Sequence, residues 1–213
     1  MAFFDLDNTL IDRQGALESY AAEFCRAREL GASAEREMLT LLGARAYPKD
    51  FEALRQRWGL AESASALWES YVDGVSTRVT CLPGVTAGLD RMRAGGWALA
   101  VVTNGAADIQ RAKLEHVGLC EYFATVCVSE EVGVRKPDPR IFHATAERCG
   151  VDLTRHGWMV GDGAVTDIGG GAAVGLHTMW IALGRLWTTE GATPDRVADT
   201  TAAAISELLA ESE

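Results

Sequence analysis

The stretch Phe3-Phe4-Asp5-Leu6-Asp7-Asn8-Thr9 decides the fold that we expect for this chain. It overlaps a short apolar run, Ala2–Leu6, which is typical of a buried strand. Two acids, Asp5 and Asp7, stand at the end of that run. In open parallel sheets, ligands bind at the carboxyl ends of the strands, so these acids indicate where a site should lie.

The chain after Pro83-Gly84 alternates between helix and strand signals. Each of four further apolar runs is expected to form a strand after an amphipathic helix. The expected strands are Ala98–Val102, Thr125–Val128, Trp158–Val160 and Thr178–Ala182, and the helices before them are Val85–Ala94, Ala107–Val117, Pro139–Cys149 and Ile168–Val174. This alternation predicts an α/β fold, a doubly wound, Rossmann-like parallel sheet with helices on both faces.

Residues 14–80 differ, because no strand signal interrupts them. Helices are expected at Ala16–Leu30, after Ser33, from Pro48 and over Ser63–Val75. We therefore expect an α/β core of residues 1–13 and 81–213 and an all-helical cap of residues 14–80. Several polar residues of this region are candidates to face the active site, and the sequence does not choose among them: Arg13, Gln14, Arg45 and Tyr47.

Composition excludes several classes of protein. With 213 residues, 48% of them hydrophobic and 23% charged, the chain is globular. The formal net charge of -10 repels a nucleic acid backbone, so no nucleic acid partner is expected. The cysteines form no Cys-x-x-Cys pair, which favours a reducing compartment. No signal peptide and no apolar run of membrane-spanning length is visible, and we expect a cytoplasmic protein without a membrane partner.

Four polar clusters follow predicted strands and should meet in one crevice. They are Asp5 with Asp7, Thr103-Asn104-Gly105, Lys136 in Arg135-Lys136-Pro137-Asp138, and Asp162 with Asp167. Oxygen ligands without nitrogen partners favour a hard cation such as Mg²⁺. Packed carboxylates also need a cation, because like charges raise one another's pKa.

These residue types suit phosphoryl transfer. A carboxylate nucleophile needs the charge of its phosphate target to be offset, which a metal and Lys136 can do. Asp7 can protonate a leaving group and then activate water for the second half-reaction. The Thr103 hydroxyl and backbone N–H groups near Asn104 can hold phosphoryl oxygens.

The four clusters resemble the motifs of the haloacid dehalogenase-like hydrolase superfamily, and they occur in the order and at the spacing usual in that superfamily. The matching stretches are Asp5-Leu6-Asp7-Asn8-Thr9-Leu10, Val102-Thr103-Asn104-Gly105, Lys136-Pro137-Asp138 and Gly161-Asp162…Asp167. The helical insert looks like the cap of phosphatase members. The resemblance implies that Asp5 is the nucleophile, Asp7 the general acid/base, and Thr103 the residue that binds the transferring phosphoryl group. Asn104 beside it is a further candidate for substrate binding, with a role in turn geometry as the alternative. The resemblance also implies that Lys136 offsets charge, and that Mg²⁺ is held by Asp5, the Asp7 carbonyl and Asp162, with Asp167 in its outer shell.

Two details refine the resemblance. Dehalogenases of the family lack the second acid of the first motif, so Asp7 favours phosphate ester hydrolysis over carbon–halogen cleavage. Gly163 departs from the pattern, because members commonly have a small hydroxyl or amide residue there, and this departure bears on metal affinity. We therefore expect a magnesium-dependent phosphatase of small phosphorylated metabolites. The alternatives are a mutase-type transfer and a non-catalytic phospho-acceptor module, with a dehalogenase ranked last.

Overall fold

The structure is a computed structural model that describes residues 1–153 and 157–210. The chain forms two compact units. The first comprises Met1–Ile11, Cys81–Asn104 and Gly118–Glu213, and the second comprises Asp12–Thr80 and Gly105–Val117.

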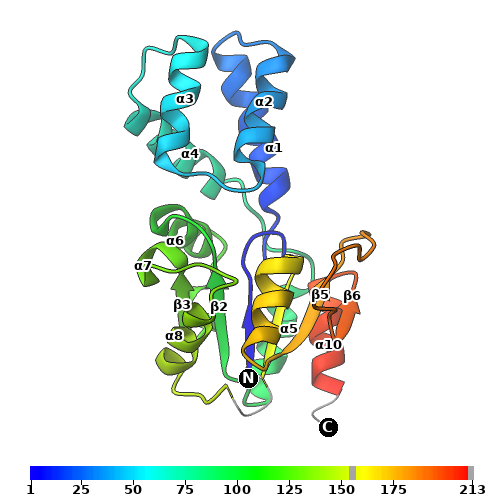
Figure 1. Cartoon of the computed structure of the whole chain (residues 1–213). Coiled ribbons are helices and arrows are strands. Elements are labelled where there is room, and N and C mark those ends of the chain that lie inside the picture. The colour runs from blue at the N-terminus through cyan, green and yellow to red at the C-terminus, as the bar shows by residue number, and fades with distance from the viewer. Residues whose placement is uncertain (154–156, 211–213) are drawn as a thin grey trace. The chain divides into compact units, whose positions relative to one another are not determined.

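The first unit contains a six-stranded sheet in the order β3-β2-β1-β4-β5-β6, and every pair of neighbours is parallel (Figure 1). The strands are β1 (Ala2–Phe4), β2 (Leu99–Thr103), β3 (Thr125–Val128), β4 (Trp158–Gly161), β5 (His177–Ile181) and β6 (Arg196–Ala198). The predicted doubly wound parallel sheet is confirmed. The chain runs outward from β1 to β3 and then returns to the other side of β1 with β4. The switch point, where a ligand crevice forms in such sheets, is therefore at the carboxyl ends of β1 and β4.

Helices cover the sheet on both faces. They are α5 (Val85–Ala94), α7 (Ser129–Val132), α8 (Pro139–Cys149), α9 (Gly170–Ala173) and α10 (Thr201–Ala210), with a 3₁₀ turn η1 (Cys120–Tyr122) and a π-helical turn η2 (Ala164–Gly169). One core cluster includes Phe3, Ala100 and Met159 of the strands together with Phe142 of α8. Because strand side chains alternate, the equally buried Phe4 faces the other layer.

Two features of this unit differ from expectation or were not foreseen. The helix expected at Ile168–Val174 begins earlier, as η2, and continues as α9. Helix α10 was not predicted, although its buried residues Thr201, Ala204, Ile205 and Leu208 follow helical spacing. Strand β6 carries no clear pattern, because it is only three residues long and mostly exposed. Asp195 fixes this strand instead: its carboxylate accepts hydrogen bonds from the N–H (2.7 Å) and hydroxyl (2.9 Å) of Thr178 in β5.

The second unit is entirely helical. It contains α1 (Arg13–Ala27), α2 (Ala32–Gly43), α3 (Pro48–Trp58), α4 (Ala64–Ser76) and α6 (Ala107–His116). Ser63 caps α4 by accepting a hydrogen bond from the Ala66 N–H at 3.1 Å. Aromatic rings fill the interior, with Phe51, Trp68 and Tyr71 at centroid distances of 5.1–5.5 Å.

Helix α6 packs with α4 in this unit, and the Trp68 indole donates a hydrogen bond of 2.6 Å to Asp108. Residues 105–117, which the sequence assigned to the core, therefore group with the helices. Arg13 has a structural role, because its guanidinium donates to the carbonyls of Leu42 (2.6 Å) and Gly43 (2.5 Å) at the end of α2. No helix within residues 1–153 and 157–210 is both long and apolar enough to cross a bilayer.

Candidate active site

The loop after β1 carries the acids of the first cluster. The Asp5 N–H donates to the carbonyl of Val160 at 2.9 Å, which brings this residue beside the end of β4. The chain then turns tightly around the Leu6 carbonyl, which accepts N–H groups from Leu10 (2.9 Å) and Ile11 (3.2 Å). Asn8 adopts a left-handed conformation, φ 56°, which asparagine tolerates better than most residues. Asp7 lies within this turn, beyond the end of β1 at Phe4.

Lys136 brings two of the predicted acids together. Its Nζ lies 2.8 Å from Oδ1 of Asp5 and 2.7 Å from Oδ1 of Asp167. The Lys136 side chain is 1% exposed, that of Asp167 0% and that of Asp5 14%. Buried charges need such partners, because an unpaired charge inside a protein is strongly unfavourable. Asp5 is the more accessible carboxylate of the two.

Asp162 completes an acidic cluster with Asp5 and Asp167. One carboxylate oxygen from each of these residues can be chosen so that all three lie within 4.8 Å of one another. The three carboxylates face two cations, the ammonium of Lys136 beside Asp5 and Asp167 and the guanidinium of Arg185 at 3.3 Å from Asp162, so the cluster has room in its charge balance for a further cation. Its all-oxygen donor set is the kind that suits Mg²⁺. The residues present therefore fit a hard divalent ion.

Burial and crowding shift the pKa values in this cluster. Burial raises the pKa of Asp5 to about 7, against the lowering effect of Lys136 and with further upward contributions from Asp167 and Asp162. Burial also raises the pKa of Asp162 to about 6, and the negative charge of Asp167 adds to that shift. Burial alone would lower the pKa of Lys136, but the charges of Asp167 and Asp5 raise it. Lys136 is therefore a fixed positive charge at neutral pH.

The other predicted residues lie around this centre. Thr103 is buried at the end of β2, directly before Asn104. The Asn104 side chain is occupied by Lys136, since its Nδ2 donates to the Lys136 carbonyl at 3.0 Å and its Oδ1 accepts the Lys136 N–H at 2.9 Å. Asp7 is partly buried, and its charge contributes to the raised pKa of Asp162. The Asn104 side chain thus joins the cluster that follows β2 to the backbone of Lys136.

Two glycines leave space for Asp167. A Cβ at Gly161 would collide with the Asp167 carboxyl group. A Cβ at Gly163 would collide with the hydroxyl of Thr166 and come within 2.9 Å of the Asp167 carboxylate. That carboxylate also accepts the Gly163 N–H at 2.8 Å. Gly163 is the position where this chain lacks the small polar residue of the family pattern. The structure shows that Thr166 and Asp167 of η2 approach the backbone closely at this position.

The family model of haloacid dehalogenase-like hydrolases matches residues 2–181. The chain belongs to this family. The match includes all four polar clusters, so the resemblance inferred from the motifs is confirmed.

Relatives of this hydrolase include named phosphatases. The phosphoserine phosphatase of Thermus thermophilus is 36% identical over 159 residues, which are 74% of this chain and 63% of that protein. The chain thus spans less than two thirds of that relative. The glyceraldehyde 3-phosphate phosphatase of Methanopyrus kandleri is 30% identical over 210 residues, which are 92% of this chain and 89% of that protein.

Solved structures agree with the fold. The HAD phosphatase from Thermococcus onnurineus superposes with a TM-score of 0.72 at 26% identity, covering 97% of this hydrolase and 96% of that chain. The L-2-haloacid dehalogenase from Xanthobacter autotrophicus gives a TM-score of 0.74 at 20% identity, over 97% of both chains. At that identity the second likeness shows the shared fold alone.

Two residues of this hydrolase that contact Asp162 were missed from the sequence. Trp180 in β5 donates its indole N–H to the Asp162 carbonyl at 3.0 Å, and Arg185 donates to the same carbonyl at 3.1 Å. Arg185 follows the carboxyl end of β5, so the rule that located the other clusters also applies to it. Trp180 has no such signal, because its pattern is that of an ordinary core residue of a strand.

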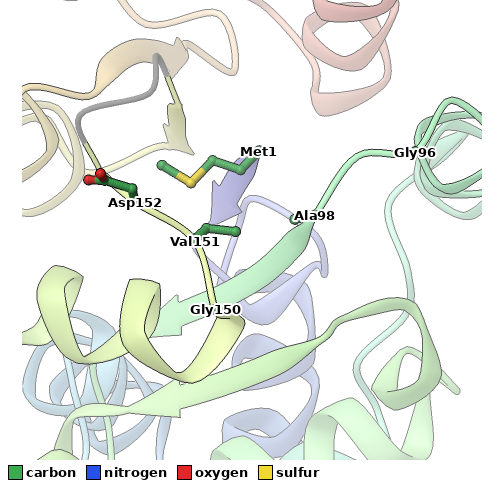
Figure 2. Close-up of a pocket in the computed structure, with 6 residues that line it drawn as sticks. All are labelled: Met1, Gly96, Ala98, Gly150, Val151 and Asp152. Atoms are coloured by element: carbon green, nitrogen blue, oxygen red, sulfur yellow. The ribbon is translucent and has the colours of Figure 1, made fainter.

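A separate pocket of about 420 Å³ lies at the opposite ends of the strands (Figure 2). Met1 and Ala98 stand just before β1 and β2, and Gly150, Val151 and Asp152 follow α8. Of the lining residues that the figure labels, Asp152 alone has an ionisable side chain. This pocket is therefore distinct from the acidic cluster at the carboxyl ends.

Proposed function

We propose that this hydrolase removes phosphate from a small organic phosphate monoester, with Mg²⁺ as cofactor and Asp5 as the nucleophile. The observation that carries the proposal is the position of Lys136 between Asp5 and Asp167, beside Asp162. A partly accessible carboxylate next to a buried, permanently positive ammonium is suited to attack an anionic phosphorus centre.

In the first half-reaction, a carboxylate oxygen of Asp5 attacks phosphorus and the ester P–O bond breaks. Asp7 gives its proton to the departing oxygen, which leaves as an alcohol. In the second half-reaction, Asp7 takes a proton from water as that water attacks the phosphorus of the aspartyl-phosphate. Inorganic phosphate leaves, and the Asp5 carboxylate is restored.

The other residues serve charge and orientation in this proposal. Lys136 offsets the charge of the transferring group, and Thr103 donates its hydroxyl to a phosphoryl oxygen. The Asn104 side chain positions Lys136 by holding the backbone of Lys136, in addition to any contact that Asn104 makes with phosphate. Asp5, Asp162 and the Asp7 carbonyl hold the metal, and Asp167 orients the groups around it. The bound Mg²⁺ would offset phosphate charge and lower the cost of ionising the clustered carboxylates.

Two considerations narrow the substrate. The relatives named above act on phosphoserine and glyceraldehyde 3-phosphate, both small phosphorylated metabolites. Asp7 supplies the acid that an alcohol leaving group needs and that displacement of a halide does not need. We further propose that the helical insert, residues 14–80, is a cap that selects the leaving group, and that the protein acts in the cytoplasm.

The test is phosphate release from a panel containing phosphoserine, glyceraldehyde 3-phosphate, a sugar phosphate and a nucleoside monophosphate, with Mg²⁺ or with EDTA. We expect release from at least one compound with Mg²⁺ only, and its loss in Asp5→Asn. Asp90→Asn, an exposed residue of α5, is the matched control and should keep full activity. Absence of release above Asp5→Asn across the panel would overturn the proposal. Transfer of phosphate to another position of the substrate, without free phosphate, would indicate a mutase instead.

A further inference from the structure

Asp162 is held from the side of β5 by two donors. The Trp180 indole N–H and the Arg185 Nη2 both donate to its backbone carbonyl, at 3.0 and 3.1 Å. The same Nη2 lies 3.3 Å from the carboxylate Oδ2 of Asp162. Trp180 is 4% exposed and packs against Ile168, with the Trp187 ring edge-on to it at 5.0 Å. The carbonyl and the carboxylate of one residue are thus fixed by the same guanidinium.

The turn that delivers Arg185 is strained. Leu183 and Gly184 both have positive φ, 51° and 74°, and the Arg185 N–H donates to the Ala182 carbonyl at 2.9 Å. Glycine accepts this conformation freely, but a leucine in it is uncommon and strained. Such strain persists only where surrounding contacts hold it. Here the turn is held by the hydrogen bonds of Arg185 and by the Leu183 N–H, which donates to the Asp199 carbonyl at 3.2 Å.

Arg185 is anchored at several points. Its Nε donates to the Ala182 carbonyl at 2.9 Å, and its Nη2 donates to the Ile181 carbonyl at 3.0 Å. The guanidinium therefore bridges the end of β5 to Asp162 at the end of β4. Its planar set of donors is suited to this bridging, whereas a lysine ammonium can reach fewer of these acceptors at once.

We propose that Arg185 is a positioning residue for Asp162, and that by fixing this carboxylate it strengthens the binding of the divalent cation at the acidic cluster. This inference rests on the proposed role of Asp162 as a metal ligand. Arg185 also carries a positive charge, which by itself would repel Mg²⁺. The guanidinium side chain is 47% exposed, so water screens that repulsion, while its hydrogen bonds to the 19% exposed Asp162 are retained. Orientation should therefore outweigh repulsion.

The test is calorimetric titration of MgCl₂ into substrate-free wild type, Arg185→Ala and Arg185→Lys. Loss of groups that orient metal ligands typically costs 10–100-fold in affinity, so we expect Kd for Mg²⁺ to rise about tenfold in Arg185→Ala. Arg185→Lys should lie between the two. At saturating Mg²⁺, kcat for phosphate release should stay within about threefold of wild type, because the reacting groups are unchanged.

Control variants distinguish a specific loss of Mg²⁺ affinity from a general loss of structure. Arg91→Ala, an exposed arginine of α5, should bind Mg²⁺ like wild type. Trp180→Phe keeps an aromatic ring, although a smaller one, and removes the other donor to the Asp162 carbonyl. It should weaken Mg²⁺ binding even if Arg185→Ala does not fold. Unchanged or tighter binding in a folded Arg185→Ala overturns the proposal, as does a wild type that binds no Mg²⁺. Wild type that binds Mg²⁺ but releases no phosphate would contradict only the proposed function.

Discussion

The ammonium group of Lys136 lies 2.7 Å from Oδ1 of Asp167, and both side chains are almost completely withdrawn from water. The same ammonium is 2.8 Å from Oδ1 of Asp5, so one buried cation serves two carboxylates. Such an arrangement is sensitive to the loss of its cation, because the carboxylates that remain are then buried without a partner.

Replacing Lys136 by methionine should therefore impair both stability and activity. Lys136→Met keeps a long side chain but leaves Asp5 and Asp167 unpaired, and we expect about 3–5 kcal/mol of lost stability at pH 8. The loss should be smaller at pH 5, where Asp5, whose pKa is raised to about 7, is protonated. Urea unfolding at the two pH values measures this. Equal losses at both would contradict the role of Lys136 as a counter-ion.

The pH dependence of stability should run opposite to that of metal binding. In metal-free protein the pKa of Asp5 is about 7 and that of Asp162 about 6, both above their ordinary value of 3.8. The folded state then binds more protons than the unfolded state between about pH 4 and 7, so these groups stabilise it less as pH rises. Mg²⁺ requires ionised carboxylates, and its affinity should increase over the same window.

The expected loss of folding stability with rising pH is measured by comparing wild type with Asp162→Asn in EDTA. From pH 4.5 to 7.5, the free energy of unfolding of wild type should fall relative to the variant by on the order of 1–3 kcal/mol. Parallel curves for the two proteins would show that Asp162 has an ordinary pKa.

The glycine at the end of β4 should be intolerant of a methyl group. Gly161→Ala would push a Cβ into the Asp167 carboxyl group, which is fully buried and cannot move outward. We expect a loss of about 1–3 kcal/mol in stability and a marked drop in phosphate release. Gly43→Ala is the control, since nothing lies within 4 Å of its Cβ position. A Gly161→Ala variant as stable and active as Gly43→Ala would argue against the tight packing around Asp167.

The C-terminal helix should support the loop that carries Asp5, the proposed nucleophile. The Thr201 hydroxyl, at the start of α10, donates to the buried carbonyl of Thr9. Thr201→Val removes this donor with little change of shape, and we expect about 1–2 kcal/mol of lost stability together with reduced activity. Ser206→Ala removes an exposed hydroxyl from the same helix, and it should be nearly neutral. Thermal unfolding and phosphate release distinguish the two variants.

The sequence by itself predicted five of the six strands of the sheet and the polar residues that gather at their carboxyl ends. Apolar runs that end in Asp5, Thr103 and Asp162 predicted strands with polar ends, and parallel pairing brings such ends to one edge whatever the details of packing. The same rule predicted that Asp5 and Lys136 meet in one crevice. That part of the site is encoded locally, by short segments whose pattern is visible in one dimension.

Only the tertiary structure decided which contacts hold those residues. The use of the Asn104 amide by the Lys136 backbone, the hydrogen bonds from Trp180 and Arg185 to Asp162, and the packing of α6 with α4 join segments far apart in the chain. Local periodicity reports which face of an element is apolar, but it does not report which distant group meets that face. Those contacts depend on the approach of separate elements, and they become visible only when the chain is folded.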